Sequence, residues 1–247
     1  MKRYLFEKDP VTKEEYAIEN PQWTKRAKRA NYNFLLQWSG IPKNYWDLDF
    51  RDYKGDISRG QVEIAQAFAK NITHEKVKNT NLYLWGPNSS QKTMIACAIG
   101  KEAIRQGLYV QFILAGDLID ALMKNQGYGR NEEENQRIRN IKMSHMVIVD
   151  DMFDDKKSMM WKTANSDLIV VEVDRFIRHM TSENIHCVFS SNIELPTIKF
   201  NYGQSLYELM DREFLSLKFE DLIRTHRKDR YNDITDFLKK NPEGPKT

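Results

Sequence analysis

Short apolar runs alternate with longer segments of helical period through the middle of the chain. Four runs have the length of buried strands, and each is followed by a helical pattern of ten or more residues. The runs are 82–85, 109–114, 145–151 and 186–192, and the helical segments are 93–106, 116–125, 166–184 and 205–217. Strands separated by crossover helices pair in parallel. We therefore predict an α/β fold, an open parallel sheet flanked by helices that binds ligands beyond the carboxyl ends of its strands.

The first 53 residues follow a different pattern. They are rich in aromatic and basic residues and are interrupted by Pro10, Pro21 and Pro42. Residues 40–50 read as a connector, and residues 58–72 then carry an apolar helical face. We predict a small helical N-terminal segment over residues 1–53, one α/β domain over 54–235 and a flexible tail over 236–247.

Composition narrows the class of protein. Of 247 residues, 40% are apolar and 30% are charged, as expected for a folded globular chain. The sequence contains neither an apolar run of about 18 residues nor an apolar stretch behind the N-terminal charges, so we expect no membrane contact and no secretion. Cys97 and Cys187 lie far apart, which argues against a disulfide framework and for a reducing cytoplasm.

The charge distribution says more than the net charge of +3. Basic residues gather at Lys25–Arg29 and again at Arg224–Arg230. Each cluster fits a solvated helix face, and each also fits a surface that meets phosphates or an acidic partner.

The first strand leads into a candidate phosphate-binding loop, "GPNSSQKT". Gly86, Lys92 and Thr93 have the spacing of G-x-x-x-x-G-K-[ST], in which backbone N–H groups and a helix N-terminus bind phosphate, the lysine adds charge and the hydroxyl binds Mg²⁺. We expect nucleotide contacts from the whole loop: Gly86, Pro87, Asn88, Ser89, Ser90, Gln91, Lys92 and Thr93. Gln91 replaces the second glycine. If the backbone there has positive φ, the replacement costs on the order of 1 kcal/mol without removing an N–H donor.

Two further strand ends carry polar side chains. "HMVIVDD" ends in Asp150, which we assign to Mg²⁺ together with Thr93, and in Asp151, which we assign as the general base for the attacking water. "HCVFSSN" ends in Asn192, which is placed to hold that water against the γ-phosphate. Acids and amides are also common in ordinary turns, but loop and acidic strand together indicate a site for ATP and Mg²⁺.

With these three elements in order, the chain resembles AAA+ P-loop ATPases, most closely bacterial helicase loaders of the DnaC/DnaI type and their phage relatives, with IstB-type transposition ATPases as close kin. The resemblance spans about residues 41–231 and is most specific over 82–122. It implies a helicase loader that binds a hexameric replicative helicase and single-stranded DNA, in a bacterial cytoplasm that includes that of a phage-infected cell.

The resemblance also implies residue roles. "LYELMDREF" is similar to the helix that carries an arginine finger, which makes Arg212 the candidate for self-association, although a surface salt bridge would explain it too. Arg227 and Arg230 are alternative nucleotide sensors. Phe153, Lys156 and Lys157 are candidates for contacting single-stranded DNA. Asp151 occupies a position where the resembled ATPases more often have Glu. Together with Gln91, this predicts slow ATP hydrolysis, which suits a protein that switches between two states.

Three function classes stay open: a helicase-loading ATPase, a transposition helper ATPase that would grip duplex DNA, and a nucleotide-binding adaptor with little hydrolysis. The sequence shows no acceptor site that would indicate a small-molecule kinase. In the N-terminal segment, the apolar positions fit either a partner-binding face or packing against the chain's own domain. These positions are Trp23, Tyr32, Phe34, Leu35, Leu36, Trp38 and Ile41.

Overall fold

The computed structural model describes residues 4–8, 15–19, 21–125, 132–153 and 166–221. Its centre is a five-stranded sheet in the order β4-β5-β6-β3-β7, with every neighbouring pair parallel. The strands are β3 (Asn81–Trp85), β4 (Val110–Leu114), β5 (Met146–Asp150), β6 (His186–Ser191) and β7 (Phe214–Lys218). The predicted fold class, a parallel sheet flanked by helices, is confirmed.

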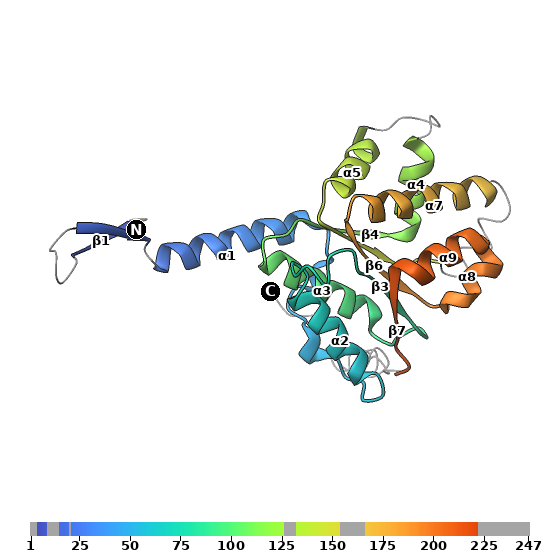
Figure 1. Cartoon of the computed structure of the whole chain (residues 1–247), viewed down its shortest axis with the longest axis horizontal. Helices are drawn as coiled ribbons and strands as arrows, with labels where there is room; N and C mark the ends of the chain where they lie inside the picture. The colour runs from blue at the N-terminus through green and yellow to red at the C-terminus, as the bar shows by residue number, and fades with distance from the viewer. Residues whose placement is uncertain (1–3, 9–14, 20, 126–131, 154–165, 222–247) are drawn as a thin grey trace, which may run out of the picture.

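Helices cover both faces of this sheet (Figure 1). Helices α2 (Arg59–Lys70) and α3 (Lys92–Arg105) pack on one face, together with the end of α1 (Pro21–Trp38). The other face is covered by α4 (Ala115–Asn125), α5 (Glu132–Lys142), α7 (Ser166–Ser182), α8 (Leu195–Tyr202) and α9 (Gln204–Glu213). Within the described part of the chain, no helix is both long and apolar enough to cross a membrane.

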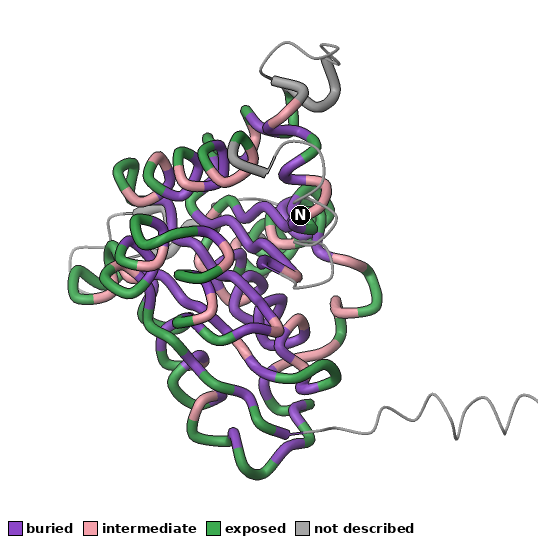
Figure 2. The backbone as a smooth tube through the Cα atoms, turned by 90° about the vertical axis from the view of Figure 1, so that its right-hand side faces the viewer, coloured by how far each residue is buried: buried purple, intermediate pink, exposed green. Residues whose placement is uncertain are grey.

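The core has two halves because side chains alternate across the strands. In β3, Leu82 and Leu84 face the α2–α3 layer, whereas Tyr83 between them faces the α7–α9 layer. All three are fully buried, and Figure 2 shows the sheet as the most continuously buried part of the chain. Both sheet faces are covered, which is why the strands read as apolar runs rather than as alternating patterns.

Two elements differ from the sequence expectation. Residues 205–217 were expected to be one helix, but α9 ends at Glu213 and residues 214–218 form β7, the edge strand beside β3. The N-terminal segment was expected to be helical, and it also contains an antiparallel hairpin of β1 (Tyr4–Lys8) and β2 (Glu15–Glu19). Two short 3₁₀ turns, η1 (Lys43–Tyr45) and η2 (Phe50–Asp52), follow α1 and lead to α2.

Candidate nucleotide-binding site

The predicted phosphate loop lies between the carboxyl end of β3 and the start of α3. Gly86 begins the loop with a φ of +147°, which glycine tolerates and other residues rarely adopt. A Cβ atom at Gly86 would lie 1.9 Å from the carbonyl oxygen of Phe219, so no side chain fits there. The loop therefore starts from a position that only glycine can occupy, with the end of β7 packed beneath it.

Gln91 occupies the left-handed conformation, with φ 62° and ψ 20°, immediately before α3. The backbone thus has the positive φ that a glycine would adopt freely, and the loop keeps the geometry despite the side chain. The Gln91 side chain makes a hydrogen bond in which its Oε1 accepts from the backbone N–H of Lys54 at 3.0 Å. The glutamine joins the phosphate loop to the connector that precedes α2.

Lys92 reaches back across the loop. Its Nζ donates to the carbonyl oxygens of Gly86 at 2.8 Å and Pro87 at 2.7 Å, and to Ser90 Oγ at 3.1 Å. Burial lowers the pKa of Lys92 to about 8, while the negative charges of Asp151 and Asp150 oppose this shift. Among the residues that the structure describes, no carboxylate lies within hydrogen-bond distance of this buried ammonium, and a bound phosphate would supply that opposite charge.

Thr93 and Asp150 meet at the predicted metal position. Thr93 Oγ1 donates to Asp150 Oδ1 over 2.9 Å, and Ser190 Oγ donates to the same oxygen. Burial raises the pKa of Asp150, while the hydroxyls of Ser190 and Thr93 act against the rise. A hydroxyl and a carboxylate are hard oxygen donors of the kind that Mg²⁺ binds directly or through its bound water, so the chemistry of this pair fits the ion.

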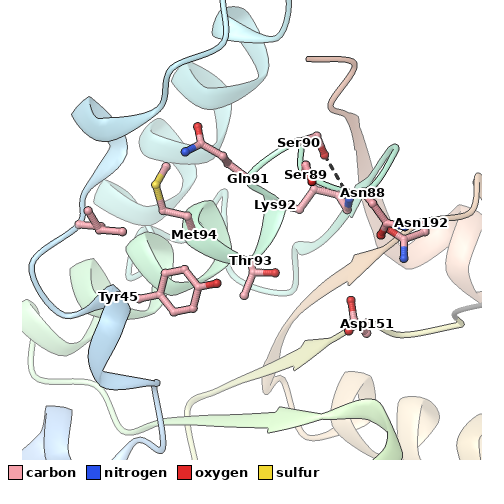
Figure 3. A pocket seen from close by; sticks show the side chains of 11 residues that line it. Tyr45, Asn88, Ser89, Ser90, Gln91, Lys92, Thr93, Met94, Asp151 and Asn192 are labelled. Carbon is pink, nitrogen blue, oxygen red and sulfur yellow. Dashed lines mark hydrogen bonds between the residues drawn. The ribbon is translucent and has the colours of Figure 1, made fainter. Parts of the chain in front are cut away.

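Asp151 and Asn192 line the same cavity as the loop (Figure 3). Asp151 follows β5 with a φ of 57°, and its backbone N–H donates to Ser190 Oγ at 3.1 Å. Asn192 follows β6, the parallel neighbour of β5. The two predicted water-positioning side chains thus line the same cavity as Lys92 and Thr93, which has a volume of about 280 Å³.

Four residues of this site were not predicted from the sequence, and one of them, Met94, directly follows the predicted loop. Ser190 is the buried partner of Asp150, and its strand-end position beside β5 was the available signal. Tyr45 and Leu48 line the cavity, although they come from the segment that was read as a connector. Figure 3 shows the ring of Tyr45 near Thr93. The available signal was an aromatic and an aliphatic residue in a segment that was read as a connector. Burial raises the pKa of Tyr45, so its hydroxyl stays protonated.

Arg212 lies apart from this cavity. It is in the last turn of α9 with its side chain 68% exposed, and its Nε donates to Glu213 Oε1 at 2.8 Å. An exposed arginine with one neighbouring carboxylate fits a surface salt bridge and also leaves the guanidinium accessible to a second copy of the chain. Arg227 and Arg230 lie outside the described residues.

The structure argues against one predicted DNA contact. Phe153 is fully buried, with its ring 4.8 Å from that of Tyr202 and 6.4 Å from that of Tyr83, measured between centroids. It belongs to the core between β5 and α8, so the prediction that it stacks on a base is wrong. Lys156 and Lys157 lie outside the described residues.

Comparisons with known proteins agree with this geometry. The model of the family described as IstB-like ATP binding protein matches residues 21–177, which is more than half of the chain. No curated protein matches the sequence.

Solved structures show the same fold at low identity. A DnaC helicase loader is 16% identical with a TM-score of 0.59, covering 72% of this chain and 99% of that one. A DnaI structure is 17% identical with a TM-score of 0.56, covering 72% of this chain and 94% of that one. AMPPCP-bound DnaA from Aquifex aeolicus is 15% identical with a TM-score of 0.53, covering 84% of this chain and 59% of that one. The family match covers more than half of the chain, and the phosphate loop, acidic strand end and polar strand end lie around one cavity, so the chain belongs to the IstB-like ATP-binding proteins.

Proposed function

We propose that this protein is an ATP-dependent loader, which binds a hexameric replicative DNA helicase and helps to place it on single-stranded DNA. The observation that carries the proposal is the convergence of Lys92, Thr93, Asp151 and Asn192 on one cavity, with Asp150 joined to Thr93 behind it. The similarity in fold to a DnaC helicase loader over nearly all of that chain supports the choice of partner.

Each side chain has a chemical task in this proposal. The ammonium of Lys92 and the N–H groups at the start of α3 bind the β- and γ-phosphates. Thr93 would hold Mg²⁺ directly and Asp150 would hold it through water, and the ion would neutralise charge on the phosphate oxygens. Asp151 accepts a proton from the attacking water while Asn192 orients that water. Arg212 of a neighbouring copy stabilises the charge that develops on the transferred phosphoryl group, which makes self-association part of the cycle.

Hydrolysis is expected to be slow. Asp151 is one methylene shorter than the commoner glutamate and reaches less far toward the water. ATP would then hold one assembly state until hydrolysis releases it, and the protein would act as a switch in the bacterial cytoplasm.

The decisive experiment mixes the protein with candidate hexameric helicases, with and without ATP, and measures the mass of the complexes and the DNA-stimulated release of phosphate. We expect an ATP-dependent complex and slow phosphate release. Lys92→Ala should abolish both, because the buried ammonium is lost from the phosphate loop. Lys199→Ala, at an exposed lysine on α8, is the matched control and should change neither. A wild-type protein that takes up no ATP at millimolar concentration would refute the proposal.

The family match favours one second candidate, a transposition helper ATPase of the IstB type. Such a protein would bind duplex DNA and a transposase instead of a helicase. Complex formation with duplex DNA and none with any hexameric helicase would favour it. A nucleotide-binding adaptor remains the third outcome, and partner binding that Lys92→Ala leaves unchanged would identify it.

A further inference from the structure

Exposed aromatic rings gather where the end of α1 meets the amino ends of β4 and β5. In the part of the chain that the structure describes, four Phe, Tyr or Trp residues are exposed, and three of them lie here. They are Phe34 and Trp38 in α1 and Tyr109 directly before β4, with 59%, 47% and 44% of their surface exposed. Single exposed rings are common on protein surfaces, but a cluster of them indicates a contact surface.

The rings of this cluster lie against one another. Trp38 contacts Tyr109 edge to face, with 6.3 Å between ring centroids and 74° between ring planes. Tyr109 stacks on His145, which is exposed directly before β5, with 5.6 Å between centroids and 14° between planes. Phe34 lies four residues before Trp38, and residues at this spacing share a helix face. We call these four side chains the aromatic platform.

Hydrogen bonds fix the backbone that carries the platform. The N–H of Tyr109 donates to His145 Nδ1 at 3.0 Å, and the N–H of His145 donates to the carbonyl oxygen of Tyr109 at 2.8 Å. The carbonyl oxygen of Trp38 accepts from Gln111 Nε2 at 3.1 Å. Because these segments are already ordered, a ligand that lies on the rings would have little further chain to order.

The helix that carries Phe34 and Trp38 also carries positive charge. Its first half contains four exposed basic residues, and the whole of α1 contains no acidic residue. The basic residues are Lys25, Arg26, Lys28 and Arg29. At 1.5 Å per residue, the helix from Lys25 to Trp38 is about 20 Å long.

This combination favours nucleic acid over a protein partner. The core of a protein-docking face is depleted of charge. Cations beside exposed rings are instead the two features that bind single-stranded nucleic acid, because the cations bind phosphates and the rings stack on bases. A duplex keeps its bases paired and stacked on each other, so a site that stacks on bases selects single strands.

The platform and the nucleotide cavity lie at opposite ends of the parallel sheet. Tyr109 and His145 precede β4 and β5, whereas Asp151 and Asn192, which line the cavity, follow β5 and β6. The two sites share no residue, so variants of one can be tested without altering the other.

We propose that the aromatic platform and the basic half of α1 form a binding site for single-stranded DNA, in which the rings stack on unpaired bases and the cations bind phosphates. The inference rests on the proposed function and names the surface by which the loader would hold the single strand. The stacking role expected of Phe153, which is buried, passes to Trp38 and its neighbours.

The test compares two strands that differ only in their bases. Fluorescence anisotropy measures binding of oligo(dT) and of an abasic strand with the same number of phosphates, each about twelve nucleotides long. We expect the wild type to bind oligo(dT) about tenfold or more tightly than the abasic strand. Trp38→Leu and Tyr109→Leu keep apolar side chains but lose the rings, so each should reduce this preference about threefold or more. Each should leave affinity for the abasic strand within about twofold.

Matched variants separate stacking from other effects. Trp38→Phe keeps a ring and should keep most of the preference. Phe200→Leu removes an exposed ring from α8, away from the platform, and should change neither affinity. The quadruple change of the basic residues of α1 to Gln should weaken both strands alike. Thermal melting checks that each variant is folded.

Three outcomes would overturn the inference. The first is a wild type that binds both strands equally or binds neither. The second is a full preference for oligo(dT) in both Trp38→Leu and Tyr109→Leu. The third is a loss of the ATP-dependent helicase complex in these variants without a loss of the preference, which would make the platform a protein-docking face. The loader proposal is refuted separately, by a wild type that takes up no ATP.

Discussion

At the phosphate loop, two local effects at Gln91 oppose each other. The left-handed backbone, with φ 62°, costs a non-glycine residue on the order of 1 kcal/mol. The hydrogen bond from the N–H of Lys54 to the Gln91 side chain is worth about as much, since a typical intramolecular hydrogen bond contributes roughly 0.5–1.5 kcal/mol. The glutamine is therefore tolerated because its side chain stabilises the loop about as much as its backbone strains it.

This balance predicts the order of stability of two variants. Gln91→Gly removes both the strain and the hydrogen bond, so we expect its free energy of unfolding to stay within about 1 kcal/mol of the wild type. Gln91→Leu keeps the strain and loses the hydrogen bond, so it should be the least stable, by about 1 kcal/mol. Urea unfolding of the three proteins measures the order. A leucine variant as stable as the wild type would show that the hydrogen bond from Lys54 contributes nothing.

The burial of individual residues in the N-terminal segment could not be predicted from the sequence. The pattern of apolar residues there fitted either a partner-binding face or packing against the chain's own domain. Leu35, Leu36 and Ile41 are buried in the core of the domain, whereas Phe34 and Trp38 are 59% and 47% exposed. All five are apolar and close in sequence, so only the direction in which each faces decides between the two roles.

Among the secondary-structure elements, α9 and β7 show how tertiary pairing overrides a local pattern. Leu206, Leu209 and Met210 have helical spacing, and the buried Phe214 and Leu217 continue it. A short apolar run of this kind is ambiguous between helix and strand. Residues 214–218 become a strand because they can pair in parallel with β3, whose edge would otherwise stay open.

The N-terminal half of helix α1 is exposed to solvent. Figure 1 shows it leading away from the sheet toward the N-terminal hairpin. Residues 25–31 are all exposed, and the helix contains four basic residues and no acidic one. A solvated helix with this charge is suited to an anionic partner, and the phosphate backbone of DNA is one.

Neutralising this charge tests whether α1 binds DNA. We expect the quadruple change of Lys25, Arg26, Lys28 and Arg29 to Gln to weaken binding of single-stranded DNA. The slope of log affinity against log salt should become shallower by about 0.7 for each phosphate that the variant no longer neutralises. The melting temperature should not fall, because these side chains are exposed. Fluorescence anisotropy of a labelled oligonucleotide at several salt concentrations measures the slope.

The control for this prediction removes the same amount of positive charge elsewhere. Lys70, Lys76, Lys78 and Lys199 are exposed and lie off α1. Their combined change to Gln should leave the salt slope as it is. Equal slopes in the two quadruple variants would show that α1 makes no specific contribution to DNA binding.

At the scale of the whole molecule, Asp221 joins segments that lie far apart in the sequence. Its carboxylate accepts hydrogen bonds from the Tyr53 hydroxyl at 2.8 Å, from the N–H of Asp56 and Ile57, each at 3.1 Å, and from the N–H of Ser58 at 2.8 Å. The neighbouring Phe219 is the residue that packs beneath Gly86. The end of β7 thus binds both the connector before α2 and the base of the phosphate loop.

This arrangement predicts a pH-dependent contribution to stability. Burial by itself raises the pKa of Asp221, but the N–H of Ser58 and the Tyr53 hydroxyl outweigh it and lower the pKa to about 2 from an ordinary 3.8. A lowered carboxyl pKa contributes stability above the unfolded value that is lost as the pH falls through the folded one. We expect Asp221→Asn to lower the free energy of unfolding by about 1–3 kcal/mol at pH 7.

Urea unfolding between pH 7 and pH 2 measures how the contribution of Asp221 to the free energy of unfolding changes with pH. The difference in free energy of unfolding between the wild type and Asp221→Asn should narrow as the pH falls from about 4 to about 2, because the unfolded wild type then binds a proton that the folded carboxylate, with its lowered pKa, does not. Asp56→Asn, at an exposed acid in the same connector, is the control and should follow the wild type. A difference that is constant over this range would contradict the role given to the Asp221 charge.

The sequence by itself determined the alternation of central strands and helices, the phosphate loop and the acidic strand end. These depend on spacing within about ten residues, which local backbone geometry and apolar periodicity control. Only the tertiary structure decided that Tyr45 and Leu48 form a wall of the cavity, that Ser190 binds Asp150, that Phe153 is core and that β7 is a strand. Each of these depends on which distant segment lies opposite, and that is set when the whole chain packs its apolar surface, not by any local pattern.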